Sequence, residues 1–189
     1  MLVLADLWLP IVVAAVFVFV ASSVVHMVLP IHKNDFAPLP DETKVLEALR
    51  PFALKPGGYR FPACTSMKDM QSPEMLEKLR RGPVGMITVF PNGPMAMGKA
   101  LGQWFVFCLV VATFAAYLGG FSLPRGAEFM TVFRVTTTVA FVGFALSSVT
   151  DSIWKGVSWG VTAKFVLDGA IYALAAGAAF GWLWPDAAA

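Results

Sequence analysis

The stretch Leu7–Pro30 reads LWLPIVVAAVFVFVASSVVHMVLP and contains no Asp, Glu, Lys or Arg. A helix that crosses a membrane needs about 20 consecutive, mostly apolar residues, and this stretch meets that requirement. A signal peptide fits less well, because residues 1–9 contain no Lys or Arg and Asp6 is acidic. The run is also longer than the roughly 7–15-residue core of a signal peptide. The stretch therefore predicts a retained transmembrane helix.

Three further apolar runs predict additional spans, at residues 100–120, 129–150 and 161–184. Of the 189 residues, 58% are hydrophobic and 14% charged, and the mean hydropathy is +0.71. Soluble domains have about 45–50% apolar and about 25% charged residues, so the composition excludes an ordinary cytosolic enzyme. The net charge of +2 also excludes a nucleic-acid binder that relies on clustered basic residues. We predict an all-α integral membrane protein with four transmembrane helices and a small α+β insertion between helices 1 and 2.

The basic residues predict the orientation of these helices. Ten of the fourteen lie between the first two helices, and Lys155 and Lys164 flank the turn between the last two. The opposite side holds Arg125, with Arg134 a short way into the third helix. Because cytoplasmic loops carry an excess of Lys and Arg, we expect a cytoplasmic insertion and outward-facing termini. The protein would then reside in a plasma membrane or a bacterial-type inner membrane.

The composition changes sharply between the first two spans, which suggests three regions. These are helix 1 (residues 1–30), an extramembrane cap (31–99) and helices 2 to 4 (100–189). So few large apolar side chains in the cap would form only a marginal core. We therefore expect the cap to pack on the helix ends or on a partner.

Local signals predict both helices and strands in the cap. Asp41 is expected to cap a helix that runs through Leu49. Ser72 is expected to cap a second helix, which Gly82 closes. Residues 59–61 and 86–90 have the composition of short strands.

The segment Gly93–Ala100, GPMAMGKA, partly matches the phosphate-binding pattern of nucleotide-binding proteins. That pattern requires Ser or Thr where this chain has Ala100, because the hydroxyl binds magnesium. Pro94 also removes one backbone donor from the phosphate cradle. No nucleotide cofactor is expected.

Polar side chains in the predicted spans concentrate on one side of the membrane. Helices 1 and 3 end where helices 2 and 4 begin, so their polar residues should converge near the cytoplasmic leaflet. Ionisable groups are costly in lipid and usually face the bundle interior, so we predict a covered polar pocket there. The residues expected to form it are His26, Gln103, Asp151, Lys164 and Asp168.

A purely structural network is the alternative interpretation of the same residues. Lys164 and Asp168 are four residues apart on one helix face, so the lysine would neutralise the carboxylate. His26 would hydrogen-bond Ser22 or a neighbouring helix. Membrane bundles use such polar contacts to hold helices together.

His26 and His32 are candidate metal ligands, because imidazole and carboxylate together suit several divalent ions. Their six-residue spacing, interrupted by Pro30, is not the four-residue spacing of a helical zinc motif. The sequence therefore permits a metal without requiring one. The surrounding segment, HMVLPIHKND from His26 to Asp35, is distinctive but indicates no function by itself.

Two features predict contact with lipid or with another chain. Arg134 can extend to the membrane surface or pair with Glu128 near the start of its helix, but it has no acidic partner at matching depth in the other helices, so an anionic headgroup or a partner subunit is expected to bind it. Gly169, Gly177 and Gly181 form a small-residue stripe on the last helix, which admits close approach of another helix. Part of this stripe must serve packing within the bundle.

The first functional interpretation is an accessory or scaffold subunit, which joins a larger membrane complex or self-assembles through its small-residue helix faces and its cap. It follows from the lack of a strong catalytic motif, so enzymatic activity is not the leading expectation. One alternative is a small transporter or proton pathway that uses the polar cluster. Another is a membrane-embedded metal-binding protein or enzyme.

Overall fold

The computed structural model describes residues 2–187, which are mostly helical and include a small two-stranded sheet. Within these residues, four helical stretches are long and apolar enough to cross a membrane. They are Leu4–Val28, Met97–Ser122, Phe129–Lys155 and Trp159–Leu183. The predicted number and approximate position of the apolar helices are thus confirmed.

The chain divides into two compact units. Unit 1 contains residues 2–36 and 96–187 of the described chain, and unit 2 contains residues 37–95. The helices of unit 1 include η1 (Leu4–Leu7), α1 (Trp8–Ser23), α5 (Met97–Ser122), α6 (Phe129–Phe144), α7 (Val149–Lys155) and α8 (Trp159–Leu183).

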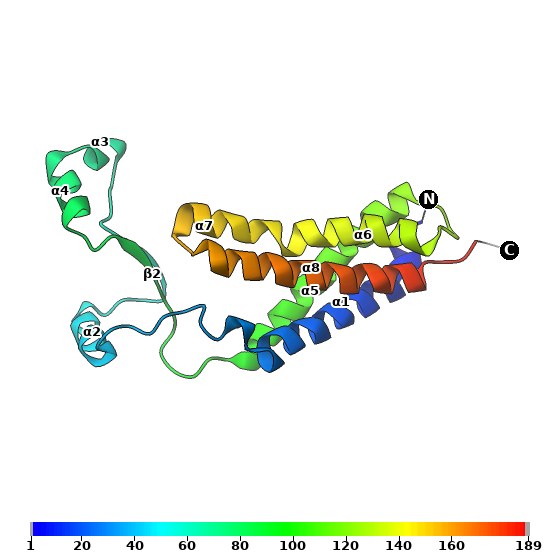
Figure 1. Cartoon of the computed structure of the whole chain (residues 1–189), viewed down its shortest axis with the longest axis horizontal. Coiled ribbons are helices and arrows are strands. Elements are labelled where there is room, and N and C mark those ends of the chain that lie inside the picture. The colour runs from blue at the N-terminus through cyan, green and yellow to red at the C-terminus, as the bar shows by residue number, and fades with distance from the viewer. Residues whose placement is uncertain (1, 188–189) are drawn as a thin grey trace. The chain divides into compact units, whose positions relative to one another are not determined.

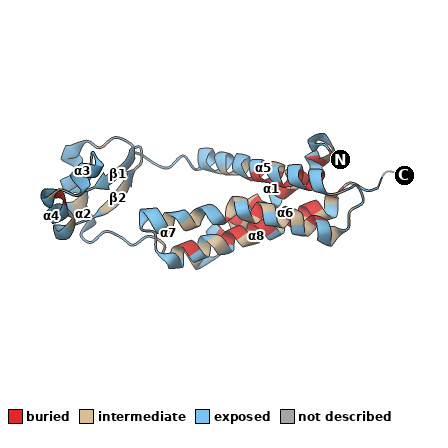
Figure 2. Ribbon diagram, turned by 90° about the horizontal axis from the view of Figure 1, so that it is seen from above, coloured by how far each residue is buried: buried red, intermediate tan, exposed pale blue. Residues whose placement is uncertain are grey.

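Four long helices of unit 1 form a bundle (Figure 1). Helix α1 packs against α5 and α8, and α6 packs against the same two helices. The order around the bundle is therefore α1, α5, α6, α8. Buried residues line the facing sides of the helices (Figure 2), and many of them are alanine or glycine, including Ala14, Ala115 and Ala173. Such small residues let helix backbones approach closely.

The third apolar stretch is interrupted, although its sequence predicts one continuous helix. Helix α6 ends at Phe144, a single 3-10 turn η5 (Leu146–Ser148) follows, and α7 continues to Lys155. Gly156 then adopts a left-handed conformation (φ 73°), which ends α7 and starts the turn toward α8.

Side-chain contacts also join the bundle's other end, where α1 begins and α8 ends. Arg125, between α5 and α6, pairs with Asp6 at 2.8 Å. The indole N–H of Trp184 donates to the carbonyl oxygen of Pro124 at 2.9 Å. These contacts hold the α5–α6 connection against both ends of the described chain.

Unit 2 contains the helices and strands of the inserted segment. They are α2 (Glu42–Leu49), η4 (Arg50–Phe52), β1 (Gly57–Phe61), α3 (Met67–Met70), α4 (Pro73–Arg81) and β2 (Gly85–Val89). The two strands are antiparallel, with Tyr59 opposite Ile87. Both predicted strands are present with slightly different bounds, whereas the short helix α3 was not predicted.

One of the two helix caps predicted in unit 2 is correct. The Ser72 hydroxyl accepts a hydrogen bond from the backbone N–H of Met75 at 3.2 Å, and α4 ends before Gly82 as expected. The prediction for Asp41 is wrong, because its side chain makes no capping bond to α2. Asp41 adopts a left-handed conformation (φ 46°, ψ 57°) in place of the extended one that an N-cap residue normally has, and its carboxylate pairs with Lys44 at 2.5 Å.

Candidate metal site at the end of helix α1

A break in the helix after α1 brings the two histidines together. A π-helical turn, η2 (Val24–Val28), carries His26, and a 3-10 turn, η3 (Pro30–His32), carries His32. Between the turns, Leu29 is extended (φ −87°, ψ 135°), as expected for a residue that precedes proline. The two imidazole rings consequently lie 4.5 Å apart between centroids, inclined by 32°.

Asp168 of α8 supplies a carboxylate to this pair. Its Oδ2 lies 2.9 Å from His32 Nε2 and 3.8 Å from His26 Nε2. The ligating atoms of all three residues lie within 4.8 Å of one another. The Asp168 side chain is only 3% exposed, whereas that of His26 is 41% exposed. The carboxylate therefore lies inside the protein, and His26 lies at the surface of the cluster.

A second carboxylate supports His32 from behind. Asp35 Oδ2 lies 2.6 Å from His32 Nδ1, and Asp35 Oδ1 accepts a hydrogen bond from Lys164 Nζ at 2.6 Å. The same ammonium group donates to the carbonyl oxygen of Ile31 at 2.8 Å. Hydrogen bonds from Lys164, and then from His32, hold the pKa of the Asp35 carboxyl below its ordinary value.

The remaining polar atoms of this cluster lack hydrogen bonds. Within residues 2–187, His32 Nε2 and both Asp168 carboxylate oxygens are buried without a hydrogen-bond partner. The 2.9 Å separation of Nε2 from Oδ2 is short enough for a hydrogen bond, but the pair lacks the required direction. If Nδ1 of a neutral His32 donates its proton to Asp35, Nε2 carries a lone pair and has no proton to donate to the Asp168 carboxylate. Two acceptors held this close would be satisfied by a proton between them or by a bound metal ion.

The structure brings three of the five predicted cluster residues into one connected group: His26, Lys164 and Asp168. The predicted pairing of Lys164 with Asp168 is wrong, because Lys164 reaches Asp35 instead. The predicted bond between His26 and Ser22 is also absent from the described residues.

Ser22 is already engaged within the bundle. Its hydroxyl donates to the carbonyl oxygen of Phe19 at 2.9 Å and accepts from the indole N–H of Trp104 at 2.8 Å. The serine therefore joins α1 to α5 and leaves His26 free to face the other imidazole.

Gln103 and Asp151 stand apart from this group. Gln103 is exposed on α5 and makes no side-chain hydrogen bond within residues 2–187. Asp151 pairs with Lys155 at 2.7 Å and lines a pocket of about 460 Å³ that also includes Asp35. The expected convergence of all five residues is therefore wrong, because Gln103 makes no side-chain hydrogen bond within residues 2–187 and Asp151 approaches the group only through the pocket that it lines with Asp35.

The glycine stripe of α8 is used within the chain. A Cβ atom at Gly169 would lie 2.6 Å from Ala145 Cβ, and one at Gly177 would lie 1.9 Å from Thr137 Oγ1. A Cβ at Gly181 would meet the Phe129 ring at 2.6 Å. The three glycines therefore pack against α6 and against Ala145, which follows α6. This corrects the prediction that they contact lipid or a partner chain.

Arg134 remains available for the contact predicted for it. Its side chain is exposed on α6, and it forms no ion pair within residues 2–187. Nothing in the described chain offers it a carboxylate, so its role as a lipid or partner contact stays a prediction.

Asp35 is the residue that sequence reasoning missed. It lies three residues after His32, in the segment beyond the predicted span, and the (i, i+3) relation to the histidine was a usable signal. No protein-family model matches the chain, and no curated protein or solved structure matches it either.

Proposed function

We propose that this chain binds a divalent first-row transition metal through His26 Nε2, His32 Nε2 and the Asp168 carboxylate. The observation that carries the proposal is the 2.9 Å approach of two buried atoms, His32 Nε2 and Asp168 Oδ2, neither of which has a hydrogen bond. A proton would satisfy those two atoms alone. The adjacent His26 Nε2, 3.8 Å from the same oxygen, adds a third ligand that a shared proton does not need.

The separations of the ligand atoms fit a metal ion. Bonds of about 2.1 Å place neighbouring ligand atoms about 3.0 Å apart at right angles and about 3.4 Å apart in a tetrahedron. The observed distances of 2.9 Å and 3.8 Å lie on either side of these values. A small rotation of the exposed His26 side chain would complete the site.

Asp35 provides the outer contact that such a site requires. Metal-binding histidines donate their second ring N–H to a carboxylate or carbonyl, which fixes the ring and raises its basicity. Here Asp35 accepts from His32 Nδ1 at 2.6 Å, and Lys164 holds the carboxylate in place at 2.6 Å. With neutral imidazoles, Asp35, Asp168 and Lys164 sum to a formal charge of about −1 at neutral pH, which a bound cation offsets.

Two imidazoles and one carboxylate leave coordination positions open. Sites of this composition suit iron, zinc and related ions, and an open position lets the metal bind water or a substrate. The exposure of His26 places those positions on the accessible side of the cluster. We therefore propose an exchangeable or reactive metal site rather than a closed structural one.

We further propose that the four apolar helices span a membrane and that the insertion lies on the cytoplasmic side. Ten of fourteen basic residues in residues 31–99 support this orientation. The metal site, where α1 ends and α8 begins, would then lie near the cytoplasmic leaflet. A role as an accessory subunit is a second candidate, supported by the exposed Arg134, which forms no ion pair within residues 2–187.

The test is a Co²⁺ titration of the full chain, freed of any affinity tag, in lipid nanodiscs. The chain has only two histidines, both in this cluster, so His26→Ala and His32→Ala each remove a defined ligand. We expect one Co²⁺ per chain with visible absorption of a nitrogen-ligated ion, and loss of that signal in both variants and in Asp168→Asn. Asp151→Asn is the matched control and should bind normally.

The titration also separates the alternatives. A wild-type chain that is folded but binds no Co²⁺ or Zn²⁺ would overturn the metal proposal and favour a protonated imidazole between two carboxylates. Equal binding by wild type and Asp168→Asn would place the metal elsewhere in the chain.

A further inference from the structure

Unit 2 has almost no core of its own. Met75 is the only buried residue among residues 37–95, all of which are described (Figure 2). Where α2 faces the sheet, the side chains leave a pocket of about 550 Å³. Ligand pockets typically measure about 300–1,000 Å³. The space that would hold the core of a small α+β unit is therefore large enough to hold a ligand.

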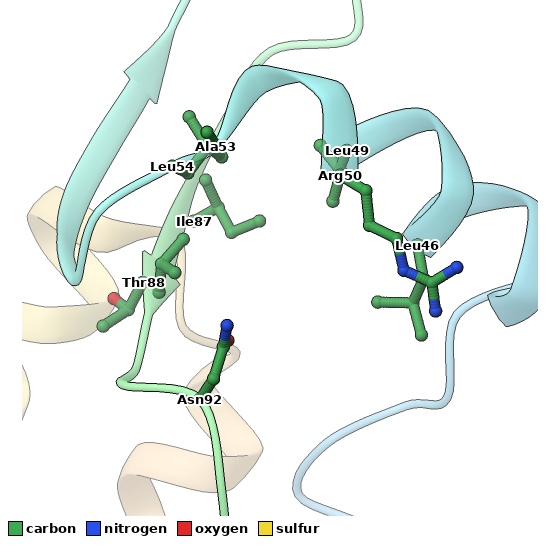
Figure 3. A pocket seen from close by; sticks show the side chains of 9 residues that line it. Leu46, Leu49, Arg50, Ala53, Leu54, Ile87, Thr88 and Asn92 are labelled. Carbon is green, nitrogen blue, oxygen red and sulfur yellow. The ribbon is translucent and has the colours of Figure 1, made fainter.

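Six of the nine residues that line this pocket are apolar. Leu46 and Leu49 contribute from α2, and Ile87 contributes from β2 (Figure 3). Val89 of β2 lines the same pocket. Ile87, Val89 and Leu49 are only half-buried, so their apolar surface is incompletely covered in the chain alone. An apolar body between helix and strand would remove that surface from water.

The polar groups at the pocket favour an anion. Arg50 and Asn92 line it, and the lining contains no acidic residue (Figure 3). Within residues 2–187, neither side chain makes a hydrogen bond, and Arg50 forms no ion pair. A guanidinium group binds carboxylate or phosphate through two parallel N–H donors, and the Asn92 amide adds another donor.

We propose that this pocket binds an acyl chain that ends in an anion, with the chain against Leu46, Leu49, Ile87 and Val89 and the anion on Arg50. The ligand class follows from the combination of an apolar wall, one unpaired cation and an unpaired amide. A free fatty acid and an anionic lipid share this chemistry. The proposal is independent of the metal site, because every lining residue belongs to unit 2.

The experiment uses dodecanoate with a photoreactive diazirine near the end of its chain. The full-length protein in phosphatidylcholine nanodiscs is irradiated with this probe, and labelled peptides are located by mass spectrometry. We expect labelling within residues 46–54 and 87–92, suppressed by unlabelled dodecanoate. Dodecanol should compete at least about tenfold less well, because it lacks the charge that strengthens the hydrogen bonds to Arg50.

Arg50→Gln is the decisive variant, and its exposed position makes a folding defect an unexpected outcome. It should remove the difference between dodecanoate and dodecanol. Arg80→Gln is the matched control, because Arg80 pairs with Glu77 on the exposed surface of α4 and lies outside the pocket. That variant should retain the full preference for the acid.

Nanodiscs that contain phosphatidylglycerol distinguish the two sources of ligand. Suppressed labelling in those discs assigns the pocket to an anionic lipid, whereas unchanged labelling assigns it to a free fatty acid. Labelling confined to the apolar helices, or labelling of the pocket that Arg50→Gln leaves unchanged, shows only partition of the probe into lipid. Either of these results overturns the proposal.

Discussion

Replacing Asp35 with Asn tests whether the hydrogen bonds behind His32 support metal binding. The carboxylate accepts from His32 Nδ1 on one oxygen and from Lys164 Nζ on the other, both at 2.6 Å. An asparagine has one acceptor oxygen, so its NH₂ group must face either the imidazole N–H or the ammonium. Loss of such an outer contact typically weakens metal binding about 10–100-fold. Because the asparagine NH₂ group would also face another N–H donor, we expect a loss near the upper end of that range. A roughly 100-fold loss of affinity corresponds to about 2.8 kcal/mol of binding free energy.

The assay is competition for Co²⁺ between the protein in nanodiscs and a chelator of known affinity. Asp151→Asn is the control, because it removes one carboxylate at the same end of the bundle, from a pair with Lys155. We expect weakened binding in Asp35→Asn with an unchanged number of sites, since the three ligands remain. An affinity equal to that of the control would refute the role of Asp35 in holding His32 for the metal.

Two further predictions concern stability. Gly169→Ala should destabilise the bundle by about 1–3 kcal/mol, because its Cβ would lie 2.6 Å from Ala145 Cβ and 2.8 Å from Ala145 Cα. Thermal denaturation measures this loss. Gly160→Ala is the control and should not destabilise the protein by a clash, because its Cβ would meet nothing within 4 Å. The lowered pKa of Asp35 means that its stabilising contribution is complete above its unfolded pKa of about 3.9 and is lost as the pH falls through the lower folded pKa. The Tm difference between wild type and Asp35→Asn should therefore be present at neutral pH and shrink in acid; a difference that grows in acid would contradict this sign.

The apolar helices could be predicted from the sequence because hydrophobic length alone identifies them. The run from Leu7 to Pro30 needs no knowledge of its neighbours to qualify as a span. The Ser72 cap was equally local, since the hydroxyl bonds a backbone group three residues away. Asp41 is also a residue type that favours N-cap positions, but its carboxylate pairs with Lys44. The sequence does not show whether this carboxylate bonds the lysine or the backbone N–H groups of the helix.

The candidate site was harder to predict because its spacing depends on a break in the helix. The helical zinc motif places its two histidines four positions apart, whereas His26 and His32 are six positions apart. The π-turn and 3-10 turn around Pro30 make six residues suffice. The partner of Lys164 also depends on the path of this segment. The four-residue spacing on one helix face predicted Asp168 as the partner, but in the structure Lys164 pairs with Asp35.

The structural and metal-binding interpretations of α8 describe different residues and are compatible. In the membrane arrangement proposed above, irregular backbone at the edge of the bilayer is tolerated only where its polar groups find partners. Lys164 meets that requirement, because it bonds the Ile31 carbonyl oxygen and Asp35 and so fastens residues 31–35 to α8. Asp168, one turn further along, faces both imidazoles and makes no hydrogen bond within residues 2–187. The lysine thus holds the segment in place, and this leaves the buried carboxylate as the group whose missing partner a metal ion would supply.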